Sequence, residues 1–283
     1  MPNPVMEGLR AIGPTRFADE TGASVLRLAI ISTPRSGNTW LRRLLATALG
    51  LDEQAALGPD EVPWDDLPRR YILQIHWNRT RSFESLLQRG GFRVVALARH
   101  PLDVLVSLAS YVSSHPAPRS IWVEHATLRG EGGDETPLLD ASPSCPAFLN
   151  YATGPRARAL FGISRQWWSK PEACAVRYED LVADPVAGLS FLIGRLGAEP
   201  AVRPEEAVAA NSLTRLRALH ADNPNHFWQG RPGLWRRLLT AEVARRIAAA
   251  QPEPFEEFGY PCDPDESLTP ARAHDHWQAL RPD

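Results

Sequence analysis

Short apolar runs alternate along this chain with stretches that have a helical pattern of apolar residues. Four runs are bounded by polar, proline or glycine residues, as buried parallel strands are: Leu26–Ser32, Tyr71–His76, Phe92–Ala98 and Cys174–Arg177. In Trp40–Gly50 the apolar residues recur every three or four positions, which predicts an amphipathic helix that ends at the glycine. Strands alternating with helices predict an α/β fold, a three-layer sandwich with a central parallel sheet.

Further helices are predicted at Arg81–Gln88, at Leu102–Val112 and around Val186–Gly197, and Pro101 suits the first position of the second of these. The acidic, proline-interrupted stretch 52–68 is expected to be a loop. Residues 113–146 are rich in Pro, Gly, Ser and acidic residues, which indicates a surface insertion or a lid, with helical pattern only at Ile121–Leu128. We expect one domain over residues 1–283, with a core at about 25–262 and a polar, peripheral tail at 263–283.

Composition excludes several classes of protein. The chain has 283 residues, 43% of them hydrophobic, and a net charge of −2, so no bulk positive field attracts nucleic acid or an anionic membrane. Its three cysteines lack C-x-x-C spacing, which argues against a disulfide framework and a zinc site. No apolar run reaches the roughly 18 residues of a membrane span, and residues 1–22 lack a signal-peptide pattern. These features predict a cytoplasmic protein.

The most informative segment is Ser32–Trp40, which reads Ser-Thr-Pro-Arg-Ser-Gly-Asn-Thr-Trp and joins the first strand to the first helix. In a loop of this kind the backbone N–H groups and the helix macrodipole favour an anion at one point. Arg35, Ser36, Asn38 and Thr39 add side-chain donors there. The segment therefore predicts a P-loop-like core that holds a nucleotide phosphate.

The loop is not a Walker A motif. That motif needs Gly-x-x-x-x-Gly-Lys-Ser/Thr, whose lysine contacts the terminal phosphates and whose hydroxyl contacts magnesium. Here the only glycine is Gly37, the cation Arg35 precedes it, and the sole lysine of the chain is Lys170. The pattern therefore disfavours metal-assisted hydrolysis of a nucleoside triphosphate.

Four segments in order resemble the sulfotransferases that use 3′-phosphoadenosine 5′-phosphosulfate (PAPS). These are Ser32–Trp40, similar to the family's 5′-phosphosulfate loop; Val94–Val112 with Arg99, Asp103 and Ser107, similar to its 3′-phosphate motif; Trp167-Trp168 followed by Tyr178-Glu179-Asp180-Leu181; and Gly230-Arg231-Pro232-Gly233-Leu234-Trp235-Arg236, similar to its closing motif. The resemblance covers about residues 26–240. It implies transfer of a sulfuryl group from PAPS to a hydroxyl or amine of a small molecule or glycan, without a metal, and release of the product 3′-phosphoadenosine 5′-phosphate (PAP).

The resemblance also implies roles for residues. The donor would be bound by Arg35, Ser36, Gly37, Asn38, Thr39, Trp40, Arg99, Ser107, Tyr178, Leu213, Gly230 and Arg231, with Trp40 and Tyr178 at the adenine. His76 corresponds to the family's general base, and a histidine suits that task because its pKa lies near neutrality. Arg35 stands where the family has lysine. Since arginine does not readily release a proton, Arg35 is predicted to stabilise charge on the leaving phosphate.

Other positions depart from the family pattern or have a structural explanation. Gln74 stands where a lysine is frequent, and Trp228 and Gln229 replace basic residues before Gly230. Asp103, in a first helical turn, is expected to stabilise the helix dipole rather than to contact a ligand. Two alternatives stay open, a P-loop-type nucleotide kinase or NTPase and a nucleotide-binding relative that has lost activity. The acceptor and the oligomeric state, monomer or homodimer, are not encoded in any motif.

Overall fold

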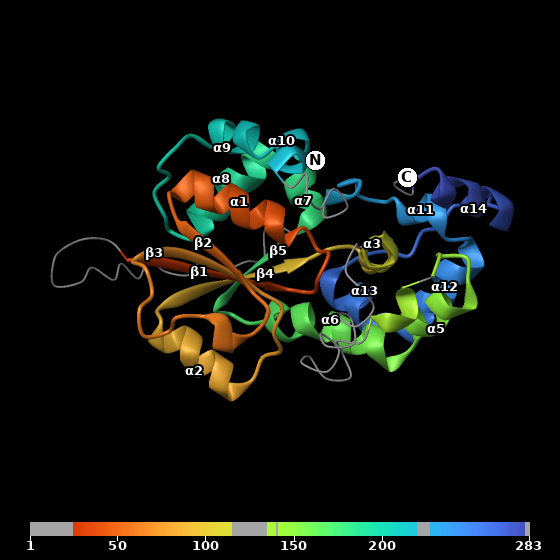
Figure 1. Ribbon diagram of the computed structural model, residues 1–283, viewed down its shortest axis with the longest axis horizontal. Coiled ribbons are helices and arrows are strands. Elements are labelled where there is room, and N and C mark those ends of the chain that lie inside the picture. Colours follow the sequence, from red (N-terminus) through yellow and green to blue (C-terminus); the bar gives the residue numbers. More distant parts are fainter. Residues whose placement is uncertain (1–24, 115–134, 140, 220–226, 281–283) are drawn as a thin grey trace.

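The computed structural model describes residues 25–114, 135–139, 141–219 and 227–280, and its centre is a sheet of five parallel strands (Figure 1). The strands are β1 Leu26–Ser32, β2 Asp52–Ala56, β3 Arg70–Ile75, β4 Phe92–Ala98 and β5 Ala173–Arg177. Their order across the sheet is β2-β3-β1-β4-β5. The chain thus adds strands first on one side of β1 and then on the other, so the carboxyl end of β1 is the switch point where open α/β sheets bind ligands.

Strand β2 corrects the prediction of a continuous loop at 52–68. Among the described residues it lies at the edge of the sheet and pairs only with β3, from Asp52 opposite Tyr71 to Ala56 opposite Ile75. Edge strands tolerate charge because one side faces water. Glu53 is exposed here and pairs with Arg42 and Arg43 at 3.1 and 2.7 Å. The apolar run that signals a buried strand is therefore missing.

The helices of the described residues surround the sheet. They are α1 Asn38–Leu49, α2 Arg81–Arg89, α3 Pro101–Ser114, α5 Pro146–Thr153, α6 Pro155–Trp168, α7 Tyr178–Ala183, α8 Pro185–Arg195, α9 Pro204–Ala210, α10 Leu213–Leu219, α11 Trp235–Leu238, α12 Ala241–Ala250, α13 Pro252–Phe258 and α14 Pro270–Gln278, with 3₁₀ turns at Pro59–Glu61 and Thr136–Leu138. The helices predicted after β1, β3 and β4 are confirmed. α1 begins two residues before Trp40, and Gly50 ends it in the left-handed conformation, with a φ of 61°.

The core is divided among the two faces of the sheet and a helical region beyond its end. One face packs on α1 and α8, where Leu28, Leu44 and Leu192 are buried together. The other face packs on α2 and α6, where Phe83 and Trp167 are buried. Figure 1 shows α1, α8 and α9 above the sheet and α2 below it, which confirms the three-layer α/β architecture.

A third core cluster is built by α3, α5, α6 and the C-terminal helices, around Trp235 and Phe148. Helix α14 contributes Trp277, which is buried against Trp228 at 6.0 Å between ring centroids. The tail at 263–283, expected to be polar and peripheral, thus contains a tryptophan that belongs to the core. Of the predicted insertion, Leu138 and Ala141 are buried in this cluster, while Ile121–Leu128 lies outside the described residues.

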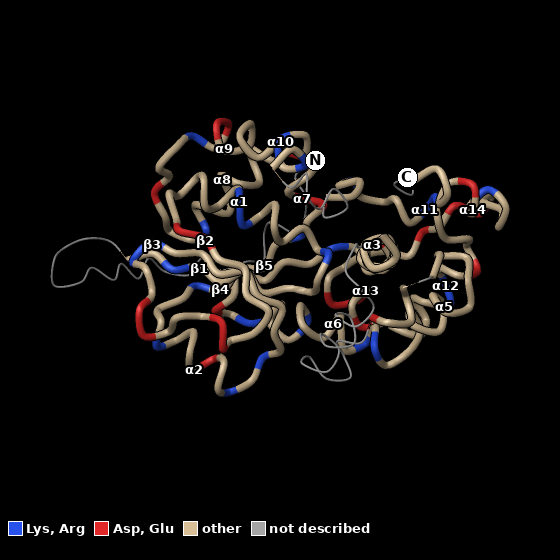
Figure 2. Tube along the Cα trace, viewed as in Figure 1, with Lys and Arg blue, Asp and Glu red and all other residues tan. Residues whose placement is uncertain are grey.

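Acidic and basic residues are interspersed over the traced chain (Figure 2), in keeping with the small net charge. Within the described ranges, no helix combines the length and the apolar character that crossing a bilayer requires.

Candidate functional site

A cavity of about 650 Å³ opens at the carboxyl ends of β1, β2, β3 and β4. This size lies within the range of roughly 300–1,000 Å³ that is typical of ligand sites. Most of the residues predicted to bind a nucleotide line it, namely Arg35, Gly37, Asn38, Thr39, Trp40, Arg99, Ser107, Tyr178, Leu213 and Gly230, and so does His76, the predicted general base. Ser36, a residue of the loop, is buried and Arg231 is exposed, and neither lines the cavity.

The loop after β1 has a backbone suited to anions. Arg35 has a φ of 67°, the only positive φ outside glycine among the described residues, and Gly37 has a φ of 96°. Alternation of ordinary and left-handed residues turns successive N–H groups toward one point, forming a nest. A non-glycine residue in this conformation costs roughly 1–2 kcal/mol, which points to a functional reason for it.

Gly37 is required for a second reason. A Cβ atom at this position would lie 2.4 Å from Cδ2 of Tyr178, closer than any real contact. The tyrosine ring therefore packs directly on the loop backbone. Both the φ of Gly37 and this contact exclude a side chain here.

Internal hydrogen bonds hold the loop in place. The Asn38 side chain accepts a hydrogen bond from the Ser32 hydroxyl and donates one to the Thr33 carbonyl oxygen at 3.3 Å. The backbone N–H of Thr33 donates to the hydroxyl of Ser164 at 2.7 Å, and that hydroxyl donates to the carbonyl of Leu97 at 2.8 Å. Asn38, predicted as a ligand donor, thus also maintains the loop.

Arg35 reaches from the loop toward α3. Its Nε donates to the Ser107 hydroxyl at 3.3 Å, and its guanidinium lies 4.5 Å from the ring centroid of Tyr111. Burial lowers the pKa of Arg35 to about 10, so the side chain is positively charged at neutral pH. Tyr111 was not singled out from the sequence, although it follows Ser107 by four residues, the spacing that puts two side chains on one helix face.

Arg99 joins this loop to the far end of the chain. Its Nη1 donates to the Arg35 carbonyl oxygen at 3.1 Å and its Nη2 to the Arg231 carbonyl oxygen at 3.4 Å. Its guanidinium lies 4.7 Å from the ring centroid of Tyr178. Its buried Nε has no hydrogen-bond partner in the described part of the chain. Arg99 therefore retains a buried donor that a ligand can satisfy.

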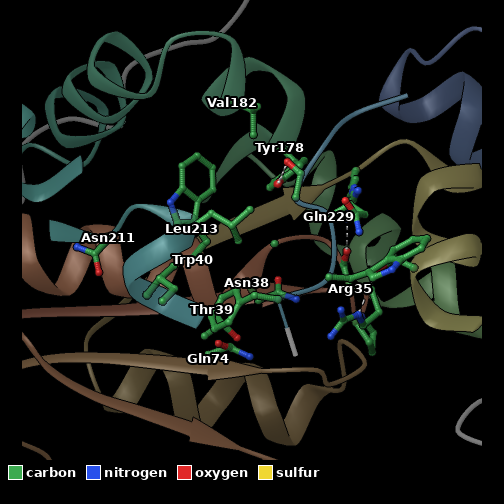
Figure 3. Close-up of a pocket in the computed structure, with 18 of the residues that line it drawn as sticks. Arg35, Asn38, Thr39, Trp40, Gln74, Tyr178, Val182, Asn211, Leu213 and Gln229 are labelled. Carbon is green, nitrogen blue, oxygen red and sulfur yellow. Dashed lines mark hydrogen bonds between the residues drawn. The ribbon is translucent and has the colours of Figure 1, made fainter. Parts of the chain in front are cut away.

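Tyr178 connects the loop to Gly230. Its hydroxyl donates to the Gly230 carbonyl oxygen at 2.9 Å, and its ring meets Trp40 edge to face at 5.8 Å. Burial raises the pKa of Tyr178, so the hydroxyl remains a donor at neutral pH. Figure 3 draws Trp40, Leu213 and Val182 on one side of the pocket and Arg35 and Gln229 on the other.

The segment after Gly230 is anchored by Asp103. The two oxygens of its buried carboxylate accept hydrogen bonds from the backbone N–H groups of Gly233 and Trp235, at 2.6 and 3.0 Å. Asp103 does lie in the first turn of α3, but its main contacts are not with its own helix. It fixes the position of a segment 130 residues away that carries Gly230 and Arg231.

Glu179 performs a similar task beside Arg99. Its carboxylate accepts a hydrogen bond from the backbone N–H of His100 at 3.0 Å and another from the Tyr260 hydroxyl. Burial raises the pKa of this carboxyl. The contacts tie α7, and with it Tyr178, to the turn that carries Arg99.

His76 follows β3 directly, and its Nδ1 lies 2.7 Å from the Ser32 carbonyl oxygen. Because a carbonyl oxygen only accepts hydrogen bonds, Nδ1 carries the hydrogen. In the neutral ring the basic lone pair is then on Nε2. The strand end and this hydrogen bond fix the ring at the wall of the cavity.

No family model matches the sequence, and no curated protein matches it. Solved structures do. Mouse sulfotransferase SULT7A1 complexed with PAP aligns with a TM-score of 0.59 at 16% identity, covering 82% of this chain and 84% of that one. Retinol dehydratase in a complex with retinol and PAP aligns with a TM-score of 0.52 at 14% identity, covering 81% of each chain. At these identities the likeness establishes the fold. The chain has the α/β fold of sulfotransferase structures.

Within the described residues, no group of three or more His, Cys, Asp or Glu side chains lies in a position to hold a metal ion. Of the Asp, Glu, Lys and Arg residues in the described ranges, Arg35 and Arg99 line the cavity.

Proposed function

We propose that this protein is a PAPS-dependent sulfotransferase. One observation carries the proposal: Arg99 donates to the backbone carbonyl of Arg35, and both side chains line one cavity. The two cations predicted to hold the 5′ and 3′ ends of one adenosine are therefore neighbours. A molecule with a phosphate at each end of a nucleoside can contact both at once.

The residues fit such a molecule. The loop offers a nest of backbone N–H groups at the N-terminus of a 12-residue helix whose first turn contains no acidic residue. The Nε of Arg99, a residue that lines the cavity, is a buried polar atom with no hydrogen-bond partner in the described part of the chain. Buried donors of this kind are costly unless a ligand satisfies them.

The cavity divides into two halves under this proposal. The nucleotide half comprises the loop Pro34–Trp40, Arg99, Ser107, Tyr178, Leu213 and Gly230. The acceptor half comprises residues 55–57 at the end of β2, Gln74, His76 and Tyr111. His76 and Arg35, which both line the cavity, would lie at the boundary where the reacting groups meet.

In the nucleotide half, Arg99 and Ser107 would bind the 3′-phosphate, and the loop would bind the 5′-phosphosulfate. Trp40, Tyr178 and Leu213 would contact the adenine, since aromatic and aliphatic side chains suit a flat base. Gly230 and Arg231 would close the site beside the 3′-phosphate, with Asp103 holding their segment.

PAPS supplies an activated sulfuryl group whose leaving group is an adenosine phosphate. Nε2 of His76 would take the proton of the attacking hydroxyl or amine, and general-base catalysis of this kind is worth about 10²–10⁴-fold. Arg35 would stabilise the charge that grows on the leaving phosphate, and one such donor contributes roughly 3–4 kcal/mol. Positioning by both halves supplies the rest of the rate enhancement. The proposed acceptor is a small molecule or a glycan.

The decisive test compares ligands. Isothermal titration should give tight binding of PAP without magnesium and much weaker binding of ATP with magnesium. Binding of ATP that depends on magnesium, with no binding of PAP, would favour a kinase or NTPase instead.

A second measurement separates an active enzyme from a relative that only binds. Incubation with ³⁵S-labelled PAPS and a panel of phenols, alcohols, sugars and amines should transfer label to at least one class. Binding of PAP without transfer to any member would identify a nucleotide-binding protein that has lost activity.

A further inference from the structure

Gln74 interrupts an apolar row that crosses the sheet. In the register of the strands, Gln74 lies opposite Ile30 on one side and Ala55 on the other. The row continues through Val95 to Cys174. Residues in register on parallel strands point to the same face, and Ile30, Val95 and Cys174 belong to the buried cluster beneath α1. A glutamine in this row needs an explanation that packing does not give.

The side-chain carbonyl oxygen of Gln74 is buried without a partner among the described residues. The residue is 8% exposed, and its Oε1 makes no hydrogen bond within the described part of the chain. A buried carbonyl left unsatisfied destabilises a fold, so natural proteins rarely keep one without a use. Gln74 lines the cavity (Figure 3), where a bound molecule can supply the missing donor.

The surroundings restrict that molecule. Beside Gln74 the wall is Ala55, Ala56 and Leu57, and Leu57 is 53% exposed, so this side of the cavity is apolar and open. None of the described residues that line the cavity is Asp or Glu. A cationic group would therefore find no opposite charge, whereas an uncharged molecule with a hydrocarbon body fits.

The position of His76 limits how far the reacting hydroxyl of an acceptor can lie from the group that meets Gln74. His76 follows Gln74 by two residues, directly after the end of β3, which spaces the two backbones by about 7 Å, and both residues line the cavity. A molecule whose reacting hydroxyl lies at Nε2 of His76 would bring an adjacent group on the same ring within reach of the Gln74 carbonyl. That carbonyl only accepts, so the adjacent group must carry an O–H or N–H.

We propose that Gln74 selects the acceptor: its side-chain carbonyl accepts a hydrogen bond from a second donor next to the hydroxyl that is sulfated. The predicted acceptor class is an uncharged ring with two neighbouring hydroxyls, such as a catechol or a cyclic 1,2-diol. The inference rests on the proposed sulfotransferase function. It goes beyond that function by naming the class of acceptor and the residue that recognises it.

The test uses matched acceptors. Catechol, phenol and guaiacol differ only in the group next to one phenolic hydroxyl, which is O–H, absent or O-methyl. Transfer from ³⁵S-labelled PAPS should give a kcat/KM for catechol about tenfold or more above those for phenol and guaiacol, because the two poorer acceptors leave the carbonyl unpaired. The alicyclic pair trans-cyclohexane-1,2-diol and its monomethyl ether should show the same order. Titration of each acceptor into the protein–PAP complex measures the preference without turnover.

Variants assign the preference to the side chain. Gln74→Leu removes the carbonyl and should reduce the catechol-to-guaiacol ratio to within about twofold, mainly by loss of catechol. Gln74→Met, closer in length, is the second variant if the first does not fold. Gln88→Leu makes the same chemical change on the exposed side of α2 and should keep the ratio. PAP affinity should be unchanged in all three.

The possible results separate a failure of the acceptor assignment from a failure of the sulfotransferase proposal. A ratio near one in the native protein, a ratio that survives Gln74→Leu, or failure of both catechol and the diol to bind the PAP complex would overturn the acceptor assignment. Failure of PAP itself to bind would overturn the sulfotransferase proposal instead, so the two failures are distinguishable.

Discussion

The proposed nucleotide half and the proposed acceptor half of the cavity are built differently. In the nucleotide half nearly every polar group is held by the protein itself: Asn38 ties the loop, Asp103 anchors the segment of Gly230, and Glu179 secures the turn of Arg99. In the acceptor half the wall is the end of an edge strand, Ala55 is exposed, and the carbonyl of Gln74 has no partner in the described chain. Within the described chain each half thus keeps a buried polar atom that a ligand can satisfy, Nε of Arg99 in one and Oε1 of Gln74 in the other, but the internal ties just named belong to the nucleotide half.

This difference teaches how the two specificities arise. A fixed nucleotide needs donors held in a fixed geometry, and each of those donors needs a supporting hydrogen bond. An acceptor site can vary by exchanging a few side chains on an edge strand without disturbing the sheet. We therefore expect substitutions in the nucleotide half to affect both binding and stability, and those in the acceptor half to affect turnover and preference.

The largest expected effect lies at the boundary, at His76. His76→Ala should lower kcat by about 10²–10⁴-fold, because the acceptor loses its base. PAP affinity should stay within about twofold, since the ring is assigned to the acceptor half. Steady-state kinetics with labelled PAPS and titration with PAP measure the two quantities.

His274→Ala, at an exposed position of α14, is the control and should keep native turnover. Native turnover in His76→Ala would remove the assigned role. A parallel loss of PAP binding would instead place His76 in the nucleotide half.

Substitution of Arg99 tests whether the nucleotide half recognises the 3′-phosphate. Arg99→Ala should weaken PAP binding by roughly 10–100-fold, the loss expected for hydrogen bonds to a charged group, and AMP binding by much less. Titration of both ligands into both proteins gives the comparison. Equal losses for PAP and AMP would contradict the assignment and indicate that Arg99 only supports the loop through the Arg35 carbonyl.

Gly37 tests how far the nucleotide half depends on packing. Gly37→Ala combines an unfavourable φ with a Cβ atom 2.4 Å from Tyr178, so the ring must move. We expect a loss of roughly 2–4 kcal/mol in the free energy of unfolding, from overpacking added to backbone strain, and weaker binding of PAP. Urea denaturation measures the first quantity and titration the second.

Gly91→Ala is the matched control for this change. Gly91 has a φ of 67°, but a Cβ there meets no atom within 4 Å. It should therefore show only the strain, about 1–2 kcal/mol, and native PAP affinity. Equal losses in the two variants would mean that the contact with Tyr178 contributes nothing.

The sequence predicts the nucleotide half better than the acceptor half, for physical reasons. The loop and Arg99 directly follow continuous apolar strands, so local patterns find both. The sequence pattern does not predict strand β2, because an edge strand needs no apolar run. The end of this strand forms the wall of the acceptor half. The tie between Asp103 and Gly233 spans 130 residues and leaves no local signal. Tyr111 has the helical spacing from Ser107 that makes it recognisable, whereas the row that makes Gln74 unusual appears only once the register is known.

The smallest expected effect concerns acid and the fold beneath the nucleotide half. The ring of His100 stacks on Trp235 at 4.9 Å, its Nε2 donates to the Pro261 carbonyl oxygen at 3.0 Å, and its Nδ1 accepts from the Leu102 N–H at 3.3 Å. Burial lowers the pKa of His100 below its usual 6.5, although Asp103 and Asp263 oppose this shift and Arg236 reinforces it. The neutral ring is thus the form that the fold accommodates.

Acid should destabilise the folded protein through His100. Below about pH 6.5 the unfolded chain takes up a proton at this position while the folded chain does not, so the free energy of unfolding falls as the pH falls. From pH 7.5 to pH 5.5 this loss in the free energy of unfolding is at most about 1.4 kcal/mol. The reason is that pH 5.5 lies one unit below the usual pKa of histidine, and one unit corresponds to about 1.4 kcal/mol. His100→Asn keeps an acceptor for Leu102 but does not titrate, so its urea-derived free energy of unfolding, measured without ligand, should fall less over this range than that of the native protein. If the two proteins lost stability in parallel, groups other than His100 would cause the acid sensitivity. The neutral state of His100 would then not stabilise the fold beneath the nucleotide half.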